Sequence, residues 1–199
     1  FLVDWYFVDR TLINSRSYYP PLPFAISNNC LAQVVTSSPI AMWPDIMQGY
    51  VRILLEARQY VYLETPYFLP TDPVLFAMRT AAIAGVDVRL MVPRHSDAKL
   101  VEWASTSYIR EAIEAGVKML ICDDMLCSCG STNIDFRSFE NNFESNIFFY
   151  DHDLTMRLKQ VFLDDLTHCT VAETTADLPH TPFYTRLWQA SARLLSPLL

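Results

Sequence analysis

The residues best suited to chemistry lie together at positions 130–133. A glycine is followed there by three small polar residues: Gly130, Ser131, Thr132 and Asn133. Hydroxyl groups, a side-chain amide and the backbone N–H groups that a tight turn frees are hydrogen-bond donors, and a concave set of donors can hold a phosphate oxygen. Glycine lets the backbone approach such a ligand closely. A polar strand-to-helix turn with capping residues explains the same run, so phosphate binding is one of two interpretations.

The surrounding chain alternates helices with apolar strands. Helical periodicity and capping residues predict helices at 44–58, 72–85, 98–115, 151–168 and 181–195. Apolar, β-rich runs predict strands at 31–36, 60–64, 86–92, 117–122, 125–129 and 143–150. Gly85 and Gly116 each follow a predicted helix and directly precede a strand, as helix-ending glycines do. This alternation predicts an α/β fold with a mixed, mostly parallel sheet and helices on both faces.

The 199 residues are predicted to form a single domain. Residues 1–29 comprise an aromatic N-terminal helix and a proline-rich connector, and residues 30–199 form the α/β core. The chain does not begin with methionine, so we expect it to be a fragment. It contains no apolar run of about 18 residues, so no membrane-spanning helix is expected.

Charge and cysteine usage narrow the class of protein. The net charge is −7 and the sequence contains no cluster of Lys and Arg, so no nucleic-acid partner is expected. The five cysteines are an odd number, which argues against a secreted disulfide framework. Cys122, Cys127 and Cys129 match no zinc-binding spacing and have no histidine nearby. They are predicted to be buried strand residues in a reducing, cytosolic environment.

The run Gly130–Asn133, seven residues after Asp123, resembles the end of the second HKD motif of cardiolipin synthases in the phospholipase D superfamily. That motif reads His-x-Lys-x4-Asp, then about six residues, then Gly-Ser/Thr-x-Asn. Further matches are Thr-Pro-Tyr-Phe at 65–68, Ser-Asp at 96–97, Asp-Phe-Arg-Ser-Phe at 135–139, Asn-Phe-Glu at 142–144 and the closing segment 193–199. The likeness covers essentially the whole chain and implies a phospholipase D-like catalytic lobe.

The resemblance implies a double displacement at a phosphodiester. Two lobes each supply a histidine, a lysine and an asparagine. One histidine attacks phosphorus and forms a phosphohistidine, and the other protonates the leaving alcohol and later deprotonates the incoming one. In a cardiolipin synthase, two phosphatidylglycerol molecules give cardiolipin and glycerol, and neither a metal nor a cofactor is required. The implied partners are phosphatidylglycerol or a related phospholipid, a membrane surface, and a second lobe from the same polypeptide or another copy. The implied location is the cytoplasmic face of the cytoplasmic membrane.

Carried over position by position, the resemblance assigns catalytic roles to Lys118, Asp123 and Asn133. It assigns substrate contacts to Gly130, Ser131, Thr132, Glu144 and Tyr67. Structural alternatives stay open for three of these residues. Asp123 is also suited to capping a turn. Glu144 also suits a charge on an edge strand, and Tyr67 a core aromatic beside a proline turn.

The beginning of the motif departs from the family pattern. Counting back from Asp123 places Lys118 at the lysine position and Gly116 at the histidine position, and glycine has no group that can attack phosphorus or carry a proton. The flanking residues read as though a short loop carrying His-x-Lys were missing after Lys118. Lys118 is then either the motif lysine or an ordinary strand lysine.

The other histidines do not replace the missing one, because none has the motif's spacing: His95, His152, His168 and His180. The chain as written is therefore predicted to be inactive. Three functions remain open for the protein. They are a phosphatidyltransferase, a phospholipase or phosphodiesterase that uses water as acceptor, and a lobe that binds phosphate or a partner without catalysis.

Overall fold

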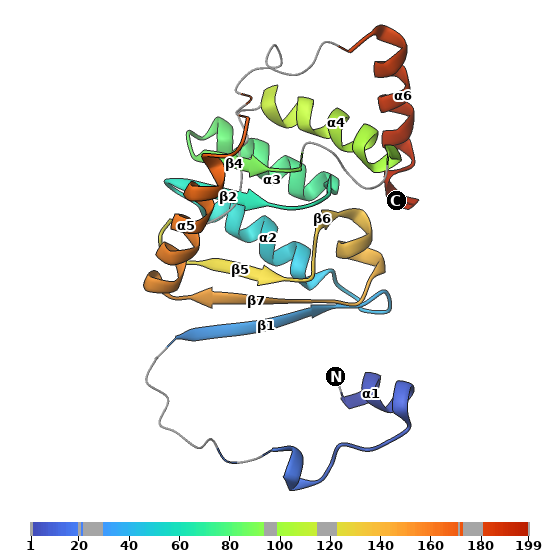
Figure 1. Cartoon of the computed structure of the whole chain (residues 1–199), viewed down its shortest axis with the longest axis vertical. Coiled ribbons are helices and arrows are strands. Elements are labelled where there is room, and N and C mark those ends of the chain that lie inside the picture. The colour runs from blue at the N-terminus through green and yellow to red at the C-terminus, as the bar shows by residue number, and fades with distance from the viewer. Residues whose placement is uncertain are drawn as a thin grey trace.

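The computed structural model describes most of the chain in two parts, an N-terminal helical segment and an α/β body (Figure 1). Helix α1 (Leu2–Asp9) is the aromatic helix predicted within residues 1–29. It ends because Arg10 adopts a left-handed backbone conformation, with φ of 59°. A short 3-10 turn follows at Arg16–Tyr18. The described residues are 2–19, 21, 30–93, 99–114, 123–170, 172 and 181–198.

The strands that the structure describes form three small sheets. β1 (Leu31–Ser37), β7 (Glu144–Tyr150) and β5 (Cys127–Gly130) make an antiparallel sheet in the order β1-β7-β5. Two parallel pairs accompany it: β2 (Tyr60–Glu64) with β4 (Asp87–Met91), and β3 (Phe68–Leu69) with β6 (Ile134–Asp135). The α/β class is confirmed, although the largest sheet is antiparallel rather than part of one mostly parallel sheet. The predicted strand 117–122 lies outside the described residues.

Five helices of the body agree with the predicted ones to within a few residues at each end. They are α2 (Asp45–Glu56), α3 (Asp72–Ile83), α4 (Lys99–Glu114), α5 (His152–Leu166) and α6 (Phe183–Leu194). Their starts have clear causes: Asp151 accepts a 2.7 Å hydrogen bond from the Leu154 N–H at the start of α5, and Pro73 occupies the first turn of α3. A π-helical turn (Arg137–Asn141) and a 3-10 turn (Ser196–Leu198) complete the body. Within the described ranges, every helix is too short or too polar to cross a bilayer.

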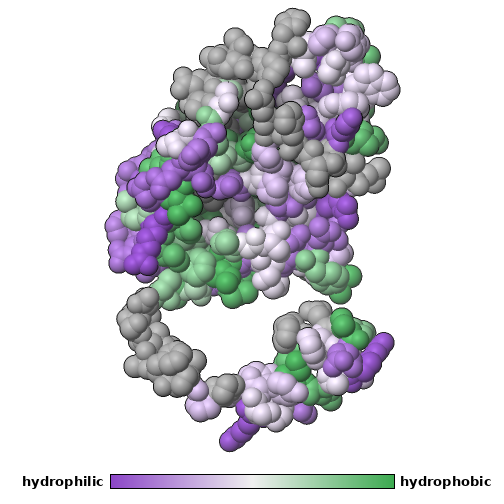
Figure 2. Space-filling view, viewed as in Figure 1, coloured by the Kyte–Doolittle hydropathy of each residue, from purple (hydrophilic) through white to green (hydrophobic). Residues whose placement is uncertain are grey.

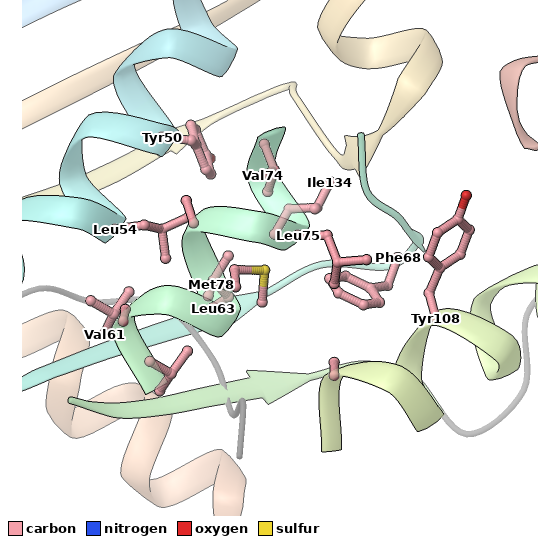
Figure 3. Close-up of a cluster of buried hydrophobic side chains, with 14 of the residues drawn as sticks. Tyr50, Leu54, Val61, Leu63, Phe68, Val74, Leu75, Met78, Tyr108 and Ile134 are labelled. Atoms are coloured by element: carbon pink, nitrogen blue, oxygen red, sulfur yellow. The ribbon is translucent and has the colours of Figure 1, made fainter. Parts of the chain in front are cut away.

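The core lies where α2 and α3 meet the parallel strands (Figure 3). Leu54, Val61, Phe68, Val74 and Met78 are almost completely buried there. Burying an aliphatic or aromatic side chain of this size contributes roughly 1.5–3 kcal/mol. This packing fixes the ends of β2, β3 and β4 relative to one another, and those ends carry part of the candidate site.

The prediction of buried strand cysteines is correct for Cys127 and wrong for Cys129, which is exposed. The two residues share one face of β5 because side chains alternate along a strand. Helix α5 packs against this strand, and burial raises the pKa of the Cys127 thiol. Cys129 lies two residues nearer the end of the strand and is not covered.

Candidate functional site

The segment Gly130, Ser131, Thr132 and Asn133, which we call the cradle, lies where strand ends of all three sheets meet (Figure 1). It leaves the end of β5 and leads directly into β6. In the antiparallel sheet, Gly130 pairs with Asn146 of β7. Thr65, which follows β2, accepts a 3.1 Å hydrogen bond from the backbone N–H just after the cradle, at Ile134.

Gly130 is required by space. A Cβ atom at this position would lie 2.1 Å from Oδ1 of Asn146 and 2.3 Å from the carbonyl oxygen of Ser145. Contacts this short are repulsive, and the Ser145 oxygen belongs to the backbone and cannot rotate away. The role of this glycine is therefore a close approach between β5 and β7 that fixes where the cradle begins.

Ser131 joins the cradle to Glu144 at the start of β7. The Ser131 hydroxyl donates a short hydrogen bond to Oε2 of Glu144 and accepts one from the Ser145 N–H at 3.1 Å. Asn142 donates to the other carboxylate oxygen at 3.2 Å. Glu144 therefore touches the cradle directly, and the partly buried carboxylate is held at its edge by two fixed donors.

Asn146 of β7 supports the cradle, although it belongs to no recognised motif. Its Oδ1 accepts a 3.2 Å hydrogen bond from the Thr132 N–H, and its amide donates to the hydroxyls of Tyr50 at 3.1 Å and Ser128 at 3.3 Å. Asn146 is only 1% exposed, and its bond to Tyr50 is buried, whereas those with Thr132 and Ser128 are partly buried. Burial also raises the pKa of the Tyr50 phenol, which keeps that partner uncharged. The sequence feature that could have indicated this role is a polar residue directly before the apolar run Ile147–Phe149.

The structure corrects the prediction that the turn frees several backbone donors. The N–H groups of Ser131, Thr132 and Ile134 are already bonded to Ser145, Asn146 and Thr65 respectively. The side chain of Asn133 is different, because it is partly exposed and has no hydrogen-bond partner among the described residues. Thr132 Oγ1 is enclosed and also unpaired within that part of the chain. Asn133 is therefore the cradle side chain left available to a ligand.

Asp123 lies away from the cradle. Its carboxylate accepts hydrogen bonds from the backbone N–H groups of Arg58 at 2.7 Å, Gln59 at 2.8 Å and Tyr60 at 2.9 Å. Tyr60 begins β2 and Thr65 follows its end, and five extended residues span roughly 16 Å. The structure thus gives Asp123 the contacts of a turn cap and does not bring it to Asn133.

The next residue, Asp124, fastens the same turn to helix α5. Its Oδ1 accepts a 2.8 Å hydrogen bond from Lys159 Nζ and a short one from the Tyr60 hydroxyl. The hydrogen bond from Lys159, followed by that from Tyr60, lowers the pKa of Asp124. Asp123 and Asp124 both have positive φ, of 45° and 57°, which is uncommon for residues other than glycine. These side-chain bonds hold the turn that leads into β5.

Tyr67 and the histidines complete the account of the predicted residues. Tyr67 is partly buried and its carbonyl oxygen accepts a 2.8 Å hydrogen bond from the Thr65 hydroxyl. It lies between Pro66 and Phe68, which line a small cavity of about 60 Å³ against α4. The His152 ring contacts the backbone oxygen of Asp124, at the end of the lobe away from the cradle, and the His168 ring lies 3.3 Å from the Thr167 hydroxyl. Lys118, His95, Gly116 and His180 lie outside the described residues.

Residues 50–166 match the model of the family described as cardiolipin synthase, PLD-like domain. The chain belongs to this family. Cardiolipin synthases from Clostridium perfringens (34% identical), Geobacillus thermodenitrificans (35%) and Bacillus subtilis (33%) match over the whole chain. The resemblance inferred from the end of the HKD motif is thereby confirmed.

Two properties of these matches bear on activity. The chain spans less than half the length of the cardiolipin synthases it matches: 45%, 42% and 44%. The alignments also extend over 215, 211 and 213 residues, although the chain has 199. Each of these relatives therefore carries at least 12 residues (211 against 199) that this chain lacks.

Solved structures support the phospholipase D-like fold. The phosphatidylserine synthase of Haemophilus influenzae superposes with a TM-score of 0.69 at 14% identity, over 88% of this chain and 49% of that one. Nuc, a phospholipase D family member from Salmonella typhimurium, superposes with a TM-score of 0.59 at 15% identity, over 70% of this chain and 95% of that one. At these identities the likeness concerns the fold alone.

Proposed function

We propose that the chain is one lobe of a two-lobe phosphatidyltransferase that makes cardiolipin and glycerol from two phosphatidylglycerol molecules. The observation that carries the proposal is the state of Asn133. It has no partner among the described residues, while the rest of the cradle is held firmly by Glu144, Asn146 and Thr65. A rigid support with one uncommitted amide suits a non-bridging phosphate oxygen. The family to which the chain belongs supports the lipid substrate.

The proposed reaction has two steps. A histidine nitrogen attacks phosphorus, the bond from phosphorus to the glycerol head-group oxygen breaks, and the second histidine gives that oxygen a proton as glycerol leaves. The head-group hydroxyl of another phosphatidylglycerol then gives its proton to that histidine and attacks phosphorus, releasing the first histidine. The Asn133 amide, with Lys118 if this is the motif lysine, stabilises the charge that develops on the non-bridging oxygens.

The remaining cradle residues act through position. Gly130 and Ser131 fix the backbone, Thr132 carries the enclosed hydroxyl beside Asn133, and Glu144 lies at the edge of the cradle. We propose that Glu144 orients the imidazole of the catalytic histidine, since a carboxylate bonded to one ring nitrogen sets which tautomer the ring adopts. Tyr67, three residues after the end of β2, is proposed to contact the lipid head group. Asp123 acts indirectly by capping the turn before β5. No step needs a metal or a cofactor.

The histidine for this lobe is absent from its motif position in the chain. We propose that the residues present in the relatives and lacking here include the His-x-Lys segment, next to Lys118. The isolated 199-residue chain should then show no phosphatidyl transfer. Measurable transfer by the purified chain would require another nucleophile and would overturn this part of the proposal.

The test of the whole proposal is a product assay on the full-length protein encoded by the intact gene. The protein is incubated with vesicles containing phosphatidylglycerol labelled in its head group, and the lipids are separated and identified by mass spectrometry. We expect cardiolipin and free labelled glycerol in equal amounts. Phosphatidic acid in place of cardiolipin would indicate water as the acceptor and a phospholipase. An unchanged lipid pool would indicate a lobe that binds without catalysis.

The proposed location follows from the substrate. Phosphatidylglycerol resides in a bilayer, so the lobe must meet a membrane surface, and we place it on the cytoplasmic side. The second lobe comes from the same polypeptide or from another copy. Cross-linking of the full-length protein at a concentration where it is active distinguishes a single chain from a dimer.

A further inference from the structure

Helix α6 is anchored to the body by its polar side. Arg193 forms an ion pair with Glu111 of α4 (Nη1 to Oε2, 2.6 Å), and its guanidinium lies 4.2 Å from the centre of the Tyr108 ring. The hydroxyls of Tyr108 and Ser196, just beyond α6, are 2.9 Å apart. Gln189 of α6 is buried on this side. These contacts fix the orientation of the helix.

The other side of α6 is apolar and faces solvent. Phe183 is 82% exposed and Leu194 81%, and Tyr184, Leu187 and Trp188 on the same face are at least 60% exposed. The exposed Ser191 is the polar residue within this face. At 100° per residue these five positions fall within an arc of about 140°. In Figure 2, α6 lies at the upper right of the molecule, where mostly pale residues stand among purple and a few green ones. An amphipathic helix normally turns such an arc towards its own core, so this face fits a surface outside the described lobe.

The charge of α6 differs from that of the whole chain. The helix contains Arg186 and Arg193 and no acidic residue, whereas the chain carries a net charge of −7. Arg193 is used by Glu111, but Arg186 is exposed at the side of the apolar arc and has no ion-pair partner in the described ranges. Trp, Phe and Leu on one face with a cation beside them are typical of helices that lie in a bilayer interface.

We propose that the outer face of α6 binds the surface of an anionic phospholipid bilayer, with Leu187 and Trp188 at its centre and Arg186 on a lipid phosphate. This inference rests on the proposed function, because that function requires the lobe to reach a lipid in a membrane. Helix α4, which holds α6, packs against β3, and Figure 3 shows Tyr108 of α4 beside Phe68 of β3. β3 pairs with β6, which begins next to Asn133. The helix that would meet the bilayer is thus linked to the cradle through α4, β3 and β6.

The test is sedimentation of the 199-residue chain with vesicles of phosphatidylglycerol mixed with phosphatidylcholine. A double variant, Leu187→Ser with Trp188→Ser, should bind at least tenfold more weakly, since exposing one such side chain instead of burying it costs roughly 1.5–3 kcal/mol. Arg186→Glu should weaken binding to these vesicles and have no effect with phosphatidylcholine alone. Phe76→Ser is the matched control, because Phe76 of α3 is 69% exposed on a different helix and should bind as the parent does.

Two results would overturn the inference. One is unchanged vesicle binding by the Leu187/Trp188 double variant. The other is a parent chain that self-associates in the ultracentrifuge through a contact the double variant abolishes, which would assign the face to a second copy. The function and this inference fail separately. Vesicle binding is measured without catalysis, so its loss tests only the membrane-binding face. The product assay uses the full-length protein, and its result does not depend on which surface meets the membrane.

Discussion

Replacing Gly130 with alanine should destabilise the lobe strongly. The new Cβ would lie 2.1 Å from Asn146 Oδ1 and 2.3 Å from the Ser145 carbonyl oxygen, so β5 and β7 must separate at this end. Separation breaks the bonds from the Ser131 N–H to Ser145 (3.1 Å) and from the Thr132 N–H to Asn146 (3.2 Å). Two hydrogen bonds at about 1 kcal/mol each and an overpacking cost of about 1–3 kcal/mol give a loss of about 3–5 kcal/mol.

Thermal unfolding followed by circular dichroism measures this loss. At about 2–4 °C per kcal/mol for a chain of this size, Gly130→Ala should melt at least 6 °C lower than the parent. Gly49→Ala is the control, because its Cβ would meet only the ring of Phe148, at 3.1 Å. Alanine also favours the α2 helix by up to about 1 kcal/mol over glycine, so this variant should melt within about 3 °C of the parent. Equal melting temperatures for Gly130→Ala and the parent would refute the close approach of the two strands.

Three further predictions concern the surroundings of the cradle. Asn146→Leu leaves the Thr132 N–H and the Tyr50 hydroxyl without their partner, at a cost of about 1–3 kcal/mol each. The urea concentration at the unfolding midpoint should therefore fall, and an unchanged midpoint would mean that water can replace these bonds. Because the pKa of Asp124 is lowered in the fold, its carboxylate stabilises the protein at neutral pH. Asp124→Asn should therefore melt below the parent at pH 7, and the difference should shrink as the pH falls below the ordinary value of about 3.9; a gap that widens in acid would contradict this. Glu144→Gln keeps partners for Ser131 and Asn142, so its melting temperature should stay within about 2 °C of the parent. Transfer by the full-length variant should fall at least tenfold, and full activity would remove Glu144 from the reaction.

Local patterns were enough to predict much of this fold. The helices of the body show a 3.6-residue repeat, and β2 was predicted at its observed bounds, Tyr60–Glu64, because it is a short apolar run between polar turns. β3 and β6 were not predicted, since a two-residue strand has no repeat to detect. The pairing of the strands could not be predicted either. Whether β5 runs beside β7 or joins β2 depends on contacts between residues far apart in the chain.

The candidate site likewise contains residues that local sequence could predict and residues that it could not. Glu144 and the cradle were recognised because they are close in sequence and match a motif. Asn146 was missed because its role depends on Tyr50, which is 96 residues away and reaches it only in the folded lobe. The apolar repeat of α6 likewise indicated a helix but gave no sign that its aromatic side faces solvent. That orientation is set by the ion pair between Arg193 and Glu111.

The central claim is that Asn133 holds a phosphate oxygen while the lipid is transferred. The direct measurement is kcat for cardiolipin formation by full-length Asn133→Ala, compared with Asn141→Ala, an exposed asparagine of the neighbouring π-helical turn. Removing one such donor typically lowers kcat about 10²–10³-fold, and we expect this loss for Asn133→Ala with an unchanged melting temperature. Asn141→Ala should keep the parent rate. Equal rates for the two variants would contradict the account.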